Sequence, residues 1–293
     1  MNETEITIDL AKKLLPKRQQ NSHKGTFGKI LNIAGCENYQ GAAYLSSLAP
    51  LKTGAGLVTL ATIENVINNL ASNCPWITFI KLKDYKKQCI HPNAFKTLIP
   101  IINNYNVFSI GSGLSNTPKT QKFVNEVLEY LKKNQNKTVI DADAINVLAN
   151  TTKQLPKNSI ITPHPLELSR LINIPVEEIQ KDRIKYAKYT AEKLNCTVVL
   201  KGNKTIICTD KSEIFINTTG NSSLAKAGSG DVLTGIISGL LAQDLSPQDA
   251  SILGVFLHGL CGELASQDLT EYSVLATDQI EYIPKAIKKI MES

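Results

Sequence analysis

Short apolar runs rich in β-branched residues alternate with stretches of helical periodicity along most of this 293-residue chain. Strands that alternate with helices predict an α/β fold with a mostly parallel central sheet. Helices are then expected to cover both faces of that sheet. The expected strands span residues 30–34, 57–61, 107–110, 138–140, 159–161 and 197–200, and the expected helices span residues 41–53, 119–133, 165–172 and 176–195.

The pattern changes after the last of these strands. Residues 205–208 and 214–216 are β-rich runs on either side of the turn-like segment 209–212, which predicts an antiparallel hairpin at the sheet edge. Beyond it, Val232 opens a helix with one broad apolar stripe, which should pack against the sheet. Two further helices are expected over residues 247–267 and 277–290.

Composition favours one ordinary globular domain over residues 1–293. No repeat, low-complexity segment or long linker divides the chain, and a hydrophobic fraction of 42% supports a sizeable core. The net charge of +6 comes from lysines that are spread along the chain, so no nucleic acid partner is expected. A mild positive field would instead collect anionic small molecules such as nucleotides.

Several features favour a cytoplasmic protein without a membrane partner. The six cysteines have neither a CxxC pair nor metal-like spacing, which is typical of reduced cytosolic thiols. The N-terminus is acidic, and no apolar run reaches the ~18 residues of a membrane span. Gly235 and Gly239 have a GxxxG spacing, which in a soluble helix indicates close packing on a neighbour.

The segment 217–231 carries the strongest functional signal. Gly220, Gly228 and Gly230 lie within eleven residues of one another, directly before a long helix. Glycines let backbone amides converge, and the helix directs its positive end to the same point, so Gly228, Ser229 and Gly230 are expected to hold phosphate. No Gly-Lys-Ser/Thr follows, so this is not a Walker A loop. A plain helix start is the alternative interpretation.

Asp231 ends this segment and is unusual there. A carboxylate in a first helical turn suits the helix dipole, yet it would repel a phosphate unless a metal or a substrate hydroxyl lay between them. We therefore interpret Asp231 as a catalytic base, with simple helix capping as the alternative.

Ligands in open parallel sheets bind beyond the carboxyl ends of the strands. His164 follows such a strand and lies between two prolines, whose stiffness suits either a contact residue or a structural histidine. Glu167 either begins a helix or orients a hydrated Mg²⁺. Asp141 and Asp143 can act as acid and base, hold a metal, or cap the helix that follows, and we favour a structural or substrate-orienting role. The loops with unusual content are residues 35–43, 111–114, 141–143 and 162–167.

Two further features are open to more than one interpretation. Lys201, Gly202, Asn203, Lys204 and Thr205 join two predicted strands, and this turn either contacts an adenine or ribose through its amides or is a plain hairpin turn. A histidine in an apolar helix is more often a core residue than a catalyst, and this is the interpretation given to His258.

In the same order along the chain, these segments resemble the ADP/ATP-dependent NAD(P)H-hydrate dehydratases of the ribokinase-like superfamily. The blocks cover nearly the whole chain. They are residues 22–28 (SHKGTFG), 41–43 (GAA), 52–58 (KTGAGLV), 141–144 (DADA), 162–165 (TPHP), 200–202 (LKG) and 228–235 (GSGDVLTG).

The resemblance implies a repair activity. Members of this family restore NADH or NADPH from the (6S)-hydrate by phosphorylating the ring hydroxyl with a nucleotide and then eliminating phosphate. Bacterial members typically convert ADP to AMP, and eukaryotic members use ATP. Mg²⁺ is expected as in other phosphoryl transfers. Relatives form tetramers, and some carry a second, epimerase domain that has no room within residues 1–293, so a separate epimerase and a homotetramer are expected.

The resemblance also assigns roles to residues. Asp231 is expected to take the proton of the ring hydroxyl, and Gly230 with its neighbouring amides to form the anion hole. Ala42 or Ala43, Gly113 and His164 are expected to contact the damaged dinucleotide. The nucleotide-binding turn is expected at Lys201, Gly202, Asn203, Lys204 and Thr205, and Glu167 is the candidate for Mg²⁺ through water.

Some positions depart from the family pattern. Ser112 stands where proline is usual, Leu166 replaces a glycine, Thr218 replaces a proline, and Lys226 varies the phosphate loop. None of these changes removes a proposed chemical group. A ribokinase-like kinase of a small hydroxymethyl vitamin precursor, or a non-catalytic nucleotide sensor, are the alternative functions.

Overall fold

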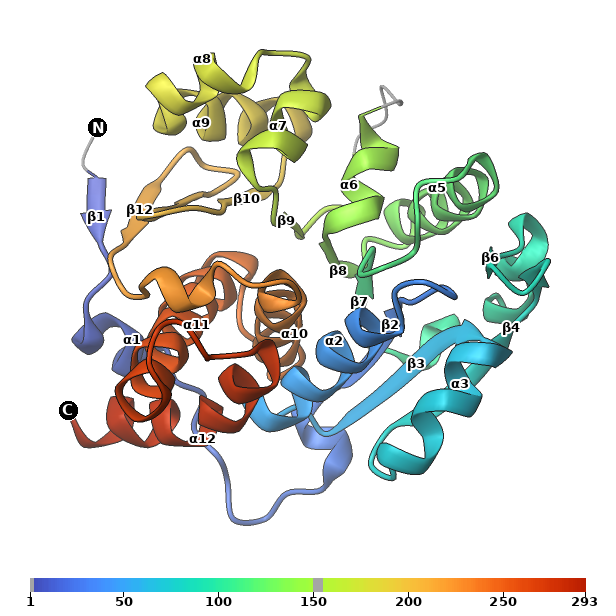
Figure 1. Ribbon diagram of the computed structural model, residues 1–293, viewed down its shortest axis with the longest axis horizontal. Coiled ribbons are helices and arrows are strands. Elements are labelled where there is room, and N and C mark those ends of the chain that lie inside the picture. The colour runs from blue at the N-terminus through green and yellow to red at the C-terminus, as the bar shows by residue number, and fades with distance from the viewer. Residues whose placement is uncertain (1–2, 150–154) are drawn as a thin grey trace.

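The computed structural model describes residues 3–149 and 155–293 and shows a central sheet with helices on both faces (Figure 1). In the described ranges the strand order is β1-β12-β11-β10-β9-β8-β7-β2-β3-β4. The pairings are parallel except for those of β11 with β10 and β12. These strands are β1 (Glu3–Glu5), β2 (Lys29–Ile33), β3 (Leu57–Ile63), β4 (Thr78–Leu82), β7 (Val107–Ile110), β8 (Lys137–Ile140), β9 (Ser159–Ile161), β10 (Thr197–Leu200), β11 (Thr205–Cys208) and β12 (Ile214–Asn217).

A small antiparallel hairpin, β5 (Asp84–Tyr85) with β6 (Cys89–Ile90), is separate from this sheet. The helices of the described residues are α1 (Ile8–Leu14), α2 (Gln40–Thr53), α3 (Glu64–Leu70), α4 (Phe95–Leu98), α5 (Pro118–Lys133), α6 (Ala142–Leu148), α7 (Pro165–Ile172), α8 (Val176–Lys181), α9 (Arg183–Leu194), α10 (Ser229–Ala242), α11 (Pro247–Leu269) and α12 (Ala276–Glu292).

Two hydrophobic cores lie on opposite faces of the sheet. Successive side chains of a strand point to opposite faces, so in β10 Val198 and Leu200 join one core while Val199 joins the other. Helices α3 and α5 to α9 cover the first face, and α1, α2 and α10 to α12 cover mainly the second (Figure 1). Strands buried on both faces explain why the predicted runs are continuously apolar.

Helix α10 is more deeply buried than its sequence pattern predicts. The prediction of a single apolar stripe facing the sheet is wrong, because every residue from Val232 to Ala242 is buried. The helix packs on the sheet, on α2 and on α11. The expected close packing at the GxxxG pair is confirmed, since a Cβ on Gly235 would lie 2.7 Å from Ala49 Cβ and one on Gly239 would lie 2.8 Å from the Pro50 carbonyl oxygen.

The predicted strands and most predicted helices are confirmed, but the expected helix over residues 176–195 is wrong. It is divided into α8 and α9 at Asp182, whose non-helical backbone ends the first helix and whose carboxylate caps the second by accepting the Lys185 N–H at 3.0 Å. The predicted hairpin of β11 and β12 is antiparallel, as expected. It lies one strand in from the edge, because β1 pairs with β12 in parallel outside it.

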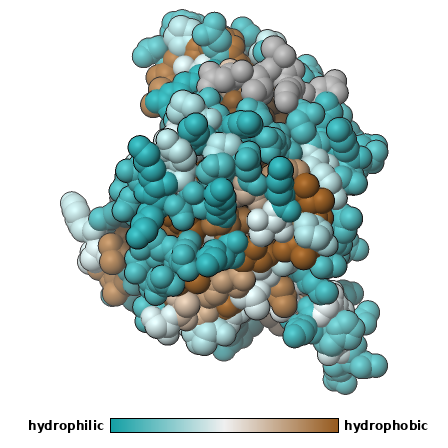
Figure 2. All heavy atoms as spheres, turned by 90° about the vertical axis from the view of Figure 1, so that its right-hand side faces the viewer, coloured by the Kyte–Doolittle hydropathy of each residue, from teal (hydrophilic) through white to brown (hydrophobic). Residues whose placement is uncertain are grey.

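The edge strands β1 and β4 gave no sequence signal. β1 is three exposed polar residues, Glu3 to Glu5, anchored by the buried Ile6 that follows. β4 is only partly buried, and Figure 2 shows the face of the molecule on its side as mostly hydrophilic with an apolar area at the centre. Within the described ranges, no helix combines the length and the apolar character that crossing a bilayer requires.

Candidate active site

A cavity of about 880 Å³ lies where the carboxyl ends of β8, β9 and β10 face the start of α10. This is the place where ligands bind in open parallel sheets. Most of the predicted site residues line it. They are His164, Lys201, Gly202, Asn203, Lys204, Thr205, Gly228, Ser229, Gly230 and Asp231.

The start of α10 is built to receive an anion. Gly228 occupies the N-cap position with φ of 90°, and a Cβ there would lie 2.5 Å from Leu45 Cδ1, so a side chain fits neither the backbone nor the space. No side chain caps the first turn. The Ser229 N–H donates to the Lys226 carbonyl oxygen at 3.2 Å, whereas the N–H groups of Gly230 and Asp231 have no backbone acceptor among the described residues and are left to a ligand.

Asp231 stands in this first turn and lines the cavity. Burial raises the pKa of Asp231 to about 6, and the negative charge of Asp141 acts in the same direction, while the Ser112 hydroxyl and Lys201 partly oppose it. A carboxylate whose pKa lies near the operating pH is suited to general-base work.

A largely buried network of charged side chains lies next to the start of α10. Lys201 Nζ lies 2.9 Å from Asp141 Oδ1 and 3.8 Å from Glu167 Oε2, and Thr234 donates to Asp141 Oδ2 at 2.7 Å. A Cβ on Gly230 would lie 3.4 Å from Lys201 Nζ, so the ammonium sits beside the proposed anion hole. Its charge adds to the N–H groups that would stabilise a transferring phosphoryl group.

Each charged side chain of this network stabilises the ionised form of its partner. Burial alone would raise the pKa of Asp141, but Lys201 and the Thr234 hydroxyl keep it below its usual value. Burial alone would lower the pKa of Lys201, but Asp141 and Glu167 together raise it. Asp141 therefore acts as the counter-ion of Lys201 and does not cap α6 with its side chain, one of the roles left open by the sequence.

His164 and Glu167 form a reciprocal cap at the start of α7. Glu167 Oε2 accepts the His164 N–H at 2.8 Å, and His164 Nδ1 accepts the Glu167 N–H at 3.2 Å. Burial and the charge of Lys201 lower the pKa of His164, which keeps the ring neutral at neutral pH. The structural role and the cavity-lining role of His164 are thus compatible. Burial raises the pKa of Glu167.

Three predicted contacts do not line this cavity. Ala43 is fully buried in the first core, and Ala42 is the more accessible member of the pair. Gly113 packs against α2, since a Cβ there would lie 2.8 Å from Ala42 Cβ. Ala42 and Gly113 therefore form a separate small-residue surface beside Tyr39, and their contact with substrate remains a prediction.

His258 is the lining residue that sequence reasoning set aside. Its Nε2 lies 3.1 Å from Ser229 Oγ and 3.2 Å from Gln279 Oε1, which links α11 to the phosphate loop. Burial lowers the pKa of His258 to about 4, so the ring is neutral. Its partners lie 29 and 21 residues away along the chain, so no local pattern could have revealed them.

A mostly parallel sheet whose cavity is closed by a glycine-rich helix start defines a ribokinase-like protein. Within that class, the chain belongs to the NAD(P)H-hydrate dehydratase family, whose model matches residues 30–285. The family predicted from the sequence blocks is thereby confirmed.

Relatives of known name agree with this assignment. The chain is 35% identical to the ADP-dependent (S)-NAD(P)H-hydrate dehydratase of Bacillus subtilis, with 99% of each chain covered. A crystal structure of the ADP/ATP-dependent NAD(P)H-hydrate dehydratase of Bacillus subtilis, co-crystallised with ATP and Mg²⁺, matches with a TM-score of 0.85, 33% identity and 99% of both chains.

A longer relative matches over part of its length. The chain is 36% identical to the bifunctional NAD(P)H-hydrate repair enzyme of Moorella thermoacetica, covering 98% of this chain and 54% of that protein. The chain therefore spans about half the length of this bifunctional relative.

Proposed function

We propose that this protein restores NADH or NADPH from the (6S)-hydrate by phosphorylating the ring hydroxyl with a nucleotide and eliminating phosphate. ADP is the proposed phosphoryl donor, with AMP and inorganic phosphate as products. The observation that carries the proposal is Asp231, which has a raised pKa and stands at an uncapped helix start inside the cavity.

The proposed reaction has two stages. Asp231 takes the proton of the ring hydroxyl, and the hydroxyl oxygen attacks the terminal phosphorus of ADP while the bond to AMP breaks. Phosphate is then a better leaving group than hydroxide. Its C–O bond breaks, the adjacent ring carbon loses a proton to solvent, and the C=C bond that forms restores the conjugated dihydronicotinamide. The N–H groups near Gly230 and the ammonium of Lys201 stabilise the charge on the moving phosphoryl group.

Mg²⁺ would neutralise phosphate charge during the transfer. Within the described ranges, no group of three or more His, Cys, Asp or Glu side chains could hold a metal. Glu167 already caps α7 and faces Lys201, so it would reach the ion only through water. Such a site suits Mg²⁺, which keeps several waters and binds largely through substrate phosphates.

The deciding experiment supplies hydrated NADH, Mg²⁺ and either ADP or ATP to the purified protein. We expect the absorbance of the reduced dinucleotide to return with one inorganic phosphate released for each molecule restored. A kinase would instead leave a phosphorylated product, and a sensor would bind nucleotide without turnover. Absence of NADH formation with both nucleotides would contradict the proposal.

Two predictions about partners belong with this function. A separate epimerase would convert the other hydrate epimer, so adding one should bring the conversion of a mixed-epimer substrate from about half to completion.

The predicted homotetramer is checked by light scattering of the purified protein. The apolar area on the β4 side is a candidate contact between copies (Figure 2).

A further inference from the structure

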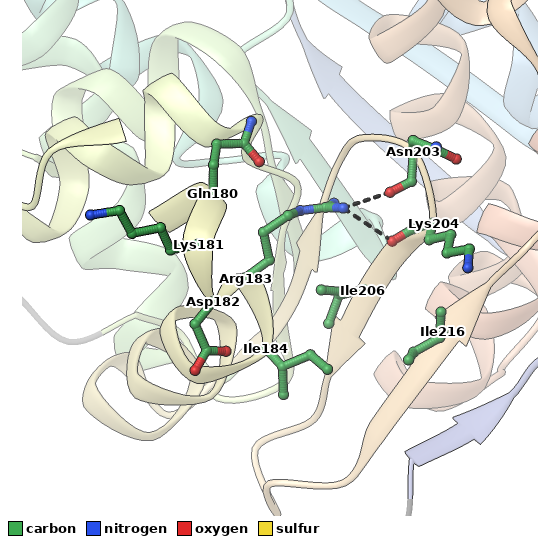
Figure 3. Close-up of a pocket in the computed structure, with 9 residues that line it drawn as sticks. All are labelled: Gln180, Lys181, Asp182, Arg183, Ile184, Asn203, Lys204, Ile206 and Ile216. Carbon is green, nitrogen blue, oxygen red and sulfur yellow. Dashed lines mark hydrogen bonds between the residues drawn. The ribbon is translucent and has the colours of Figure 1, made fainter. Parts of the chain in front are cut away.

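Arg183, the first residue of α9, binds the predicted nucleotide-binding turn from behind. Its Nη1 donates to the carbonyl oxygens of Asn203 at 2.5 Å and Lys204 at 3.3 Å, and its Nη2 donates to those of Leu200 at 3.0 Å and Lys201 at 3.3 Å. Figure 3 shows the guanidinium lying along the turn. One side chain thus binds four backbone carbonyls of one short segment.

The turn is a wall between two cavities. Asn203 and Lys204 line both the large cavity and a smaller one of about 320 Å³, which Figure 3 shows. Arg183 lines the smaller cavity and not the large one. Arg183 and the proposed nucleotide therefore lie on opposite sides of the same stretch of backbone.

Peptide geometry links the two sides. In a trans peptide the N–H of one residue points away from the carbonyl of the residue before it, and the described residues contain no cis peptide. Carbonyls of Lys201 and Asn203 that face Arg183 therefore direct the N–H groups of Gly202 and Lys204 toward the large cavity. Neither N–H donates to another backbone group among the described residues.

Gly202 fits this arrangement. Its φ is 146°, and a Cβ there would lie 2.9 Å from Arg183 Nη2, so the guanidinium occupies the space that a side chain would need. The planar fork of arginine offers separate N–H groups to several acceptors at once, whereas a lysine ammonium is a point donor. Of the three side-chain nitrogens of Arg183, Nε alone has no hydrogen-bond partner among the described residues.

We propose that Arg183 is a positioning residue that holds the turn so that the N–H groups of Gly202 and Lys204 face the nucleotide. The inference rests on the proposed function, because it takes the ligand of the large cavity to be ADP or ATP. Arg183 itself touches no substrate. It acts on nucleotide affinity through the backbone.

The test compares R183K and R183Q with the wild type. Since two ligand hydrogen bonds depend on the turn, we expect the nucleotide KM, and the Kd of ADP with Mg²⁺ measured by calorimetry, to rise about tenfold or more in both variants. The KM for the hydrated dinucleotide and the kcat at saturating nucleotide should change less than about twofold. R18Q is the matched control, because Arg18 Nη1 also donates to a backbone carbonyl, that of Gly54, at 3.1 Å, and Arg18 does not line the large cavity.

A second measurement separates positioning from charge and from folding. Added guanidinium at millimolar concentration should partly restore nucleotide affinity in R183A, because the ion can occupy the vacated space, and it should not improve R18A. If R183Q or R183A does not fold, R183K carries the test, since it keeps the charge but not the fork. An unchanged nucleotide KM in an active R183K would overturn the inference, whereas an inactive wild type would overturn the proposed function.

Discussion

Asp231 illustrates a conflict between burial and chemistry at the scale of one residue. A buried carboxylate is costly when ionised, yet the same burial gives it a pKa near the pH at which a base must work. The negative charge of Asp141 raises the pKa of Asp231 further, and its ion pair with Lys201 keeps the ammonium in place.

Replacing the proposed base should abolish turnover without abolishing binding. We expect D231N to lower kcat by about 10²- to 10⁴-fold, because the amide cannot accept the hydroxyl proton. The Kd of ADP should stay within about threefold of the wild type, measured by calorimetry. A D231N protein with wild-type kcat would remove the base from the mechanism.

The same substitution should stabilise the protein in a pH-dependent way. The unfolded carboxyl ionises near 3.8 and the folded one near 6, so the wild type loses stability as the pH rises through this interval and not below it. D231N lacks this loss. We expect urea unfolding to give D231N an advantage of about 1 to 3 kcal/mol at pH 8 and almost none at pH 4. An equal difference at both pH values would contradict the assignment.

Helix α10 connects the site to the core at the scale of an element. Its first turn forms the anion site. Where it crosses α2, at Gly235 and Gly239, there is no room for a Cβ atom. The position of the anion hole is therefore set by how closely α10 and α2 approach.

Enlarging this contact should destabilise the fold. A Cβ on Gly235 would lie 2.7 Å from Ala49 Cβ and 2.9 Å from Pro50 Cδ, so G235A must displace α2. We expect a loss of about 1 to 3 kcal/mol in the free energy of unfolding, measured with denaturant. G41A is the control, because a Cβ on Gly41 meets nothing within 4 Å and should be neutral or stabilising by up to about 1 kcal/mol. Equal effects of G235A and G41A would show that α2 and α10 can separate without cost.

At the scale of the whole molecule, the cavity joins segments that are far apart along the chain. Four segments that meet only in the folded chain supply its side chains, namely His164 before α7, Lys201 after β10, Asp231 in α10 and His258 in α11. A nucleotide bound there contacts the native state and not the unfolded chain, so binding and stability are linked.

This linkage should appear as thermal stabilisation. At an ADP concentration of about 100 times its Kd, with Mg²⁺, the expected gain is about 2.7 kcal/mol, seen as a rise of several degrees in the unfolding temperature. D231N should show the same rise, because it is expected to retain nucleotide. A wild-type protein whose unfolding temperature does not respond to ADP or ATP would contradict nucleotide binding.

The sequence by itself determined the strand and helix alternation and the parallel sheet. It also indicated the helix start at Gly228 to Asp231, because β-branched runs, glycines and helix signals act over a few residues. It also carried the family blocks, and most of the residues they indicated line one cavity.

Only the tertiary structure decided the rest. β1 takes the sheet edge through pairing with a strand about 210 residues later. Lys201 is partly buried and paired with Asp141, and Arg183 reaches the turn from another helix. The cause is the same in each case. Hydrogen bonds, charge pairing and close packing act over a few ångströms in space, and only folding brings residues distant in sequence within that range.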